Sequence, residues 1–199
     1  MTAATPELHP AQNRGLRELY AATRQLAAHW DVLAARLAGG PEAAELQAGA
    51  DAARTLLVEL ADVTPTYGLY GGPAAQGVGD RVGALRNVVA DRALERNQAL
   101  RMAVLDLQHV TTLLGYLAAL ATAQGDDALA ETCGRWERRL RRVETRARKA
   151  AVQSGEDPEV AIEPLDRGAL GRAGHRLQYA MGSVGEWVDR RAAERRGRS

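Results

Sequence analysis

Residues 16–38 read LRELYAATRQLAAHWDVLAARLA, and this stretch decides the fold class. Its apolar residues recur every three or four positions, a spacing that places them on one face of an α-helix. The members of this stripe are Leu16, Leu19, Tyr20, Thr23, Leu26, Trp30, Leu33 and Leu37. Gly39, Gly40 and Pro41 follow directly, and glycine with proline just beyond it is typical of a helix end. The stretch therefore predicts one long amphipathic helix.

The same periodicity predicts three more long helices, at about 42–63, 81–124 and 128–152. Polar residues interrupt the pattern near 91–97, where we expect a kink. After a break, a last helix is expected at about 165–196. The sequence thus predicts an all-α, up-down four-helix bundle with a C-terminal helical extension.

A chain of 199 residues fits one domain and can bury a core without disulfides. We expect a flexible N-terminal segment at 1–14, the bundle at 15–152, and an extension with a basic tail at 153–199. Because phenylalanine is absent, leucine, valine and alanine must fill the core. Cys133 is the single cysteine, which excludes an intramolecular disulfide and a cysteine-based zinc site.

The overall charge points to no particular partner. There are 26 basic and 25 acidic residues, which gives a formal net charge of +1 and predicts neither a nucleic acid nor a membrane partner by global electrostatics. The most apolar stretch, 110–123, is too short to span a bilayer, and residues 1–14 lack the apolar segment of a secretory signal. A cytoplasmic location is the default expectation.

The fourth predicted helix is rich in arginine. Its basic residues are Arg135, Arg138, Arg139, Arg141, Arg142, Arg146, Arg148 and Lys149. Glu131, Glu137 and Glu144 each precede an arginine by four residues, a spacing that favours ion pairs within a helix. The basic run is either a solvated face held by these pairs or a contact surface for nucleic acid or an acidic protein. The sequence leaves both interpretations open.

The predicted last helix carries glycines on one face beside an apolar stripe. The glycine-bearing face holds Gly171, Gly174, Gln178, Gly182 and Gly185, and the stripe holds Leu170, Ala173, Leu177, Met181, Val184 and Trp187. Each glycine inside a helix costs roughly 0.5–1 kcal/mol against alanine. Close packing of this helix, within the domain or across a homodimer, would offset that cost, so we expect the protein to self-associate.

Two stretches carry a family resemblance. Residues 16–26 read LRELYAATRQL, and Leu107-Gln108-His109 is followed by an alanine-rich run that closes at 125–127 with Gly-Asp-Asp. Together with the long connection at 64–80, these stretches resemble the bacterial stress-associated, ferritin-like family of YciE/YciF type. The resemblance implies a ferritin-like bundle whose second and third helices are joined by a crossover.

The chain departs from this family at the metal ligands. A di-iron centre needs about four inward carboxylates and two histidines. The positions where the resemblance places ligands, or that face inward beside them, are Thr23, Gln108, Gly49, Ala53, Cys133, Trp136, Leu140 and Val143. Asp106 and His109 have the spacing of half a ligand motif, and the alternative is a hydrogen-bonded cluster with Gln108. We expect no bound metal.

No catalytic set stands out. His9, His29 and His175 are isolated in sequence, and Cys133 on an apolar seam is expected to be a small buried hydrophobe. The glycines of residues 77–80 precede a predicted helix without the strand or the lysine of a phosphate loop, so we assign them to a turn.

The leading hypothesis is a non-enzymatic, metal-free bundle without a cofactor, with a structural or interaction role and self-association. The first alternative is a ferritin-like metal-binding or oxidative-stress protein using Asp106 and His109. The second is a nucleic-acid-associated protein using the arginine-rich helix.

Overall fold

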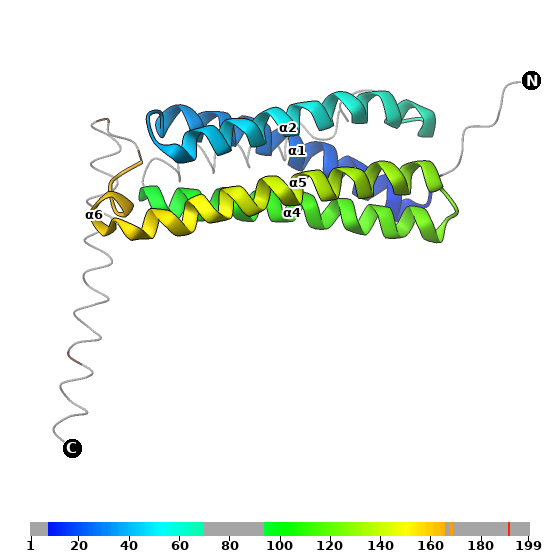
Figure 1. Ribbon diagram of the computed structural model, residues 1–199. Helices are drawn as coiled ribbons and strands as arrows, with labels where there is room; N and C mark the ends of the chain where they lie inside the picture. The colour runs from blue at the N-terminus through cyan, green and yellow to red at the C-terminus, as the bar shows by residue number, and fades with distance from the viewer. Residues whose placement is uncertain (1–7, 70–93, 166–167, 169–190, 192–199) are drawn as a thin grey trace, which may run out of the picture.

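The computed structural model describes residues 8–69, 94–165, 168 and 191, and this part of the chain is helical (Figure 1). Its helices are α1 (Pro10–Arg36), α2 (Pro41–Val63), α4 (Arg96–Ala123), α5 (Asp127–Gln153) and the short α6 (Pro158–Ala161), with single 3₁₀ turns η1 (Thr64–Tyr67) and η2 (Ser154–Glu156). The predicted all-α class is confirmed. Residues 81–93 of the third predicted helix, and nearly all of the last one, lie outside the described residues.

The four long helices pack side by side as two antiparallel pairs, α1 with α2 and α4 with α5 (Figure 1). α2 begins beside the start of α4, where Arg96 bonds to Glu42. Beyond its end, Tyr67 bonds to Asp126 at the start of α5. α2 and α4 therefore run in the same direction, and the strict alternation of an up-down bundle does not hold. Leu69 and Leu94 therefore lie near opposite ends of the bundle.

The core is built from leucine and alanine, as the composition predicts. The largest fully buried side chains are Trp30, Leu16, Leu19, Leu26, Leu33, Leu46, Leu56, Leu107, Leu114, Leu117, Leu129 and Leu140. The predicted stripe of the first helix forms one wall, since all its members except the half-buried Tyr20 are buried. Small residues let the helices approach closely, and the methyl group of an alanine at Gly15 would contact Leu117.

The first helix begins at Pro10, six residues before the predicted start, so residues 10–14 are not a flexible segment. His9 accepts a hydrogen bond from the backbone of Ala11, while the side chain of Gln12 accepts one from the backbone N–H of His9. Proline is well tolerated at the first helical position because no intrahelical partner awaits its missing N–H. The periodicity missed this turn because its residues are mainly polar.

Both ends of the second and fourth predicted helices, and the C-terminal ends of the first and third, agree with the structure to within two residues. Residues 94 and 95, inside the third predicted helix and near its expected kink, are not helical, and α4 begins after them. Gly125 has a positive φ of 71° and reverses the chain, and Asp126 accepts a hydrogen bond from the backbone of Leu129, as expected for an aspartate cap. Asp157 caps α6 in the same way through Val160. Each cap satisfies a backbone N–H that the first turn of a helix leaves free.

The start of the predicted extension is fastened to the beginning of α4. The backbone N–H of Arg96 donates to the carbonyl of Glu163 at 2.9 Å, and that of Leu165 donates to the carbonyl of Leu94 at 3.0 Å. Residues 163–165 of the predicted extension are thus held against the start of α4.

α4 contacts both α1 and α5, as expected for a central helix. By length and composition alone, this helix is apolar enough to cross a membrane. The most apolar stretch found in the sequence, 110–123, is too short to predict this. The length and composition of α4 are weak evidence of a membrane span, because a core helix of a water-soluble bundle has the same composition and 44% of the relevant window is buried.

Candidate functional site

Asp106, Gln108 and His109 do not form the cluster that we expected. Asp106 bonds to His29 of α1, with 2.7 Å between Oδ2 and Nδ1. Gln108 turns to the other side of α4 and donates to Glu144 of α5 at 2.9 Å. The Nε2 atom of His109 lies 3.3 Å from a Glu18 carboxylate oxygen. Each helical residue advances 100°, so Gln108 points away from Asp106 and His109. Asp106 and His109 are only 60° apart on the helix but bond to different residues of α1.

The interior does not fit a di-iron centre. Of the two positions where the resemblance places carboxylates, Thr23 is 0% exposed and Gln108 is half-buried and bonded to Glu144. The inward-facing positions beside them are buried and carry no carboxylate: Ala53 is 0% exposed, Cys133 1%, Trp136 2%, Leu140 0% and Val143 5%. Gly49 is covered by the ring of Trp30. In the described ranges, no three His, Cys, Asp or Glu side chains are grouped to hold a metal ion. Hard metal ions need anionic oxygen ligands, and this core offers methyl groups instead.

A shallow pocket of about 170 Å³ lies between α1 and α4. Its lining consists of Ala22, Gln25, Leu26, Leu105, Asp106 and His109. Asp106 and His109 thus share one pocket although each bonds elsewhere. Small-molecule sites usually measure about 300–1,000 Å³, so this hollow is too small for an organic cofactor.

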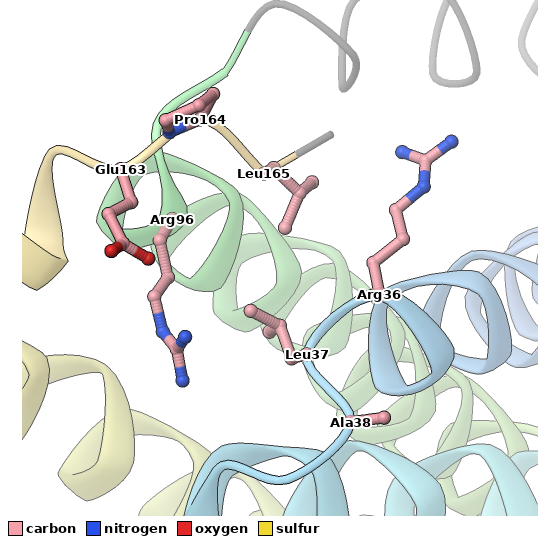
Figure 2. A pocket seen from close by; sticks show the side chains of 7 residues that line it. All are labelled: Arg36, Leu37, Ala38, Arg96, Glu163, Pro164 and Leu165. Atoms are coloured by element: carbon pink, nitrogen blue, oxygen red, sulfur yellow. The ribbon is translucent and has the colours of Figure 1, made fainter. Parts of the chain in front are cut away.

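A second pocket, of about 90 Å³, lies at the end of the bundle beside residues 163–165 (Figure 2). Arg36 and Arg96 both line it, but their side chains point in different directions. The guanidinium of Arg96 bonds instead to Glu42 at 2.9 Å, and only 15% and 8% of these two side chains are exposed. The pair joins α2 to α4 and has the character of a structural ion pair rather than an anion site.

The thiol of Cys133 and the phenol of Tyr67 are held in their neutral forms. Burial, with a smaller contribution from the charge of Asp126, raises the pKa of the Cys133 thiol to about 12. Desolvation and the hydrogen bond to Asp126, 2.7 Å long, raise the pKa of Tyr67 above its usual range. A nucleophilic cysteine needs a lowered pKa and partial exposure. Cys133 has neither property, as expected for a small buried hydrophobe.

The arginines of α5 form different ion pairs from those predicted. Of the three ion pairs predicted within this helix, the described residues form only Glu137–Arg141, at 2.7 Å. Arg135 pairs with Glu59 of α2, and Arg146 pairs with Glu45 of α2 at 2.8 Å. The remaining basic residues of the helix, all exposed, are Arg138, Arg139, Arg142, Arg148 and Lys149. Of these, Arg139 stacks over the ring of Trp136, with 4.5 Å to the ring centroid.

α4 presents a row of exposed residues without aspartate, glutamate, lysine or arginine. This outer row consists of Met102, Leu105, His109, Thr112 and Tyr116. Met102 is 47% exposed, Leu105 54% and Tyr116 49%. Their alternating spacing of three and four residues keeps them on one face over roughly 21 Å of helix. A helix that faces water usually carries charges there. The sequence pattern did not reveal the row because periodicity alone does not distinguish exposed from buried apolar residues on a helix that is apolar over much of its length.

The other histidines have structural positions. His9 caps α1, and the side chain of His29 is 7% exposed against Asp106. In the sequence, His29 directly precedes Trp30 at the edge of the apolar stripe. This position could have indicated that the His29 side chain faces a neighbouring helix. His175 and residues 77–80 lie outside the described residues. Comparison of the chain with protein-family models, curated proteins and solved structures gave no match.

Proposed function

We propose that this protein is a non-enzymatic interaction protein whose helical bundle self-associates through the outer row of α4. The observation that carries the proposal is the exposure of Met102, Leu105 and Tyr116 on a rigid helix. Met102 and Leu105 are neighbours on this face, with His109 and Thr112 between them and Tyr116, and exposed apolar patches commonly mark protein–protein interfaces.

A second copy of the chain is the occupant that we propose for the outer row. Alternating spacings of three and four residues are typical of helices that pair along a seam. In a symmetric dimer the outer row of one copy packs against the same row of the other copy. The row contains no Asp, Glu, Lys or Arg, so its own residues bring no like charges together. His109 and Thr112 in the middle of the row favour a dimer that is moderately rather than tightly held.

The non-enzymatic part of the proposal is supported by how the reactive side chains are used. Asp106 is occupied by His29, Glu18 by His109, and Asp126 by Tyr67 and the cap of α5. These contacts join neighbouring helices, which is a structural role.

We also propose that the fold is ferritin-like and that the di-iron centre of the resembling family is replaced by apolar packing. Two observations support this. α2 and α4 run in the same direction, which requires a crossover between them, as in ferritin-like bundles. Thr23 and Gln108 stand where the resemblance places two carboxylates. The metal-binding alternative would require Asp106 and His109 to leave His29 and Glu18.

Sedimentation equilibrium at high micromolar concentration tests the self-association. We expect the wild-type chain to dimerise, and the Leu105→Glu and Tyr116→Glu variants to sediment as monomers with an unchanged circular dichroism spectrum. Val58→Glu is the matched control, because Val58 is 66% exposed on α2, away from the row. A wild-type monomer, or a Val58 variant that dissociates as far as the Leu105 variant, would overturn the proposal.

A further inference from the structure

The basic residues of α5 fall into two groups. Arg135, Arg141 and Arg146 are each neutralised by a glutamate. The other five form no ion pair with any carboxylate in the described part of the chain. We call these five the basic face: Arg138, Arg139, Arg142, Arg148 and Lys149.

The acidic residues of α5 between Arg135 and Lys149 do not neutralise this face, and the exposed Glu131, on the same side of the helix, lies about 10 Å before Arg138. Glu144 accepts a hydrogen bond from Gln108 of α4, and a β-carbon at Gly115 of α4 would lie 3.2 Å from Glu137. Both glutamates are therefore on the side of the helix that packs against α4. Arg138, Arg142 and Lys149 lie within about 40° of one another on the opposite, solvent side, since each residue advances 100°. From Arg138 to Lys149 the solvent side of α5 carries positive charge alone.

We infer that the basic face of α5 binds the phosphate backbone of double-stranded nucleic acid, independently of base sequence. The face extends over about 16 Å, at 1.5 Å per residue. One strand of a duplex presents a phosphate about every 3.4 Å along its axis, or about five over that length. Arg138, Arg142 and Lys149 would contact this strand directly. Arg139 and Arg148, which lie about 180° apart on opposite flanks of the helix, would reach phosphates to either side of it.

The side-chain chemistry favours phosphates over bases. Four of the five residues are arginine, whose planar guanidinium donates two parallel hydrogen bonds to a phosphate. Among the described residues, the aromatic ring in contact with the face is that of Trp136, which is 2% exposed and lies beneath Arg139, so it cannot stack on a base. An acidic protein could meet the same charges, but the large apolar side chain that α5 exposes, Val152, lies beyond the end of the basic face rather than at its centre, where protein–protein interfaces are most apolar. The surface is separate from the outer row of α4.

Fluorescence anisotropy with a mixed-sequence DNA duplex, measured over a series of salt concentrations, tests this inference. The logarithm of the binding constant falls with the logarithm of salt concentration with a slope of about −0.9 per phosphate contacted. Five contacts give a slope of about −4.5, or about 500-fold weaker binding at 200 mM than at 50 mM salt. In the Arg138→Gln, Arg142→Gln, Lys149→Gln triple variant the slope should fall to about −1.8, or about 12-fold.

The matched control is the triple variant Arg135→Gln, Arg141→Gln, Arg146→Gln, which changes the net charge equally but removes only neutralised arginines. Its slope should stay near that of the wild type. The inference is overturned if the wild type shows no salt-dependent binding, or if both triple variants lose slope equally, since net charge alone would then be acting. It is also overturned if polyglutamate binds more tightly than the duplex, which would identify an acidic protein as the partner.

Discussion

The indole ring of Trp30 on α1 lies directly on the backbone of α2 at Gly49, where a β-carbon would overlap the ring. Trp30 is 0% exposed, so the ring cannot move aside without disturbing the core. This contact sets how closely α1 and α2 approach in the middle of the bundle.

The contact predicts that Gly49→Ala destabilises the protein by about 1–3 kcal/mol, the usual cost of overpacking a core. The cost has to exceed the roughly 0.5–1 kcal/mol that alanine normally contributes over glycine inside a helix. Gly134→Ala on α5 is the control, because its β-carbon would meet only the end of the flexible Arg138 side chain. Urea titration should show opposite signs for the two variants. Equal stabilisation by both would show that the ring does not rest on Gly49.

Trp136 provides a second test of the core. It is 2% exposed on α5, and its Nε1 donates to Glu59 of α2 at 2.7 Å. Trp136→Ala should cost about 3–5 kcal/mol of unfolding free energy. Trp136→Phe keeps most of the volume and should lose less. A loss below about 1 kcal/mol for the alanine variant would contradict the burial of this seam.

The pair Glu42–Arg96 predicts strong non-additivity. Each side chain is largely buried, so Arg96→Met leaves an uncompensated carboxylate and should cost about 3–5 kcal/mol. The double variant Glu42→Met, Arg96→Met removes both charges and should recover most of that loss. A double-mutant cycle in urea measures this. If the double variant is as unstable as the sum of the single ones, the two side chains do not interact.

Sequence periodicity predicted the helices because leucine and alanine at helical spacing have few other ways to bury their surface. It did not predict which polar residues meet. His29 and Asp106 are 77 residues apart, and their contact depends on how α1 and α4 are rotated against each other. Local spacing suggested that Arg135 pairs with Glu131, yet α2 brings Glu59 closer. Spacing rules for ion pairs within one helix leave out the carboxylates that a neighbouring helix brings close to the same arginine.

The apolar ligand positions predict that the purified protein binds no di-iron centre. Elemental analysis of protein expressed with added iron and manganese should give well below one metal ion per chain, because Thr23 and Ala53 have no anionic oxygen to offer. Two metal ions per chain that disappear in His109→Ala would refute this and support the metal-binding alternative.

Cys133 predicts a loss of stability in alkaline solution. Its thiol has a pKa of about 12 in the folded protein against an ordinary value of 9.0, because burial disfavours the thiolate. Below pH 9 the thiol is neutral in both the folded and the unfolded protein, and the fold keeps its full stability. As the pH rises from 9 toward 12, the thiol ionises only in the unfolded protein, which lowers the unfolding free energy. Between pH 9 and pH 10 the unfolding free energy should fall by about 1 kcal/mol more in the wild type than in Cys133→Ala. Urea titrations at both pH values measure the difference. The pKa of Tyr67 is also raised, from an ordinary value of 10.0, and the narrow pH range limits the effect of its ionisation on the measured unfolding free energy. Parallel losses in the two proteins would mean that the thiol is accessible to water in the folded state.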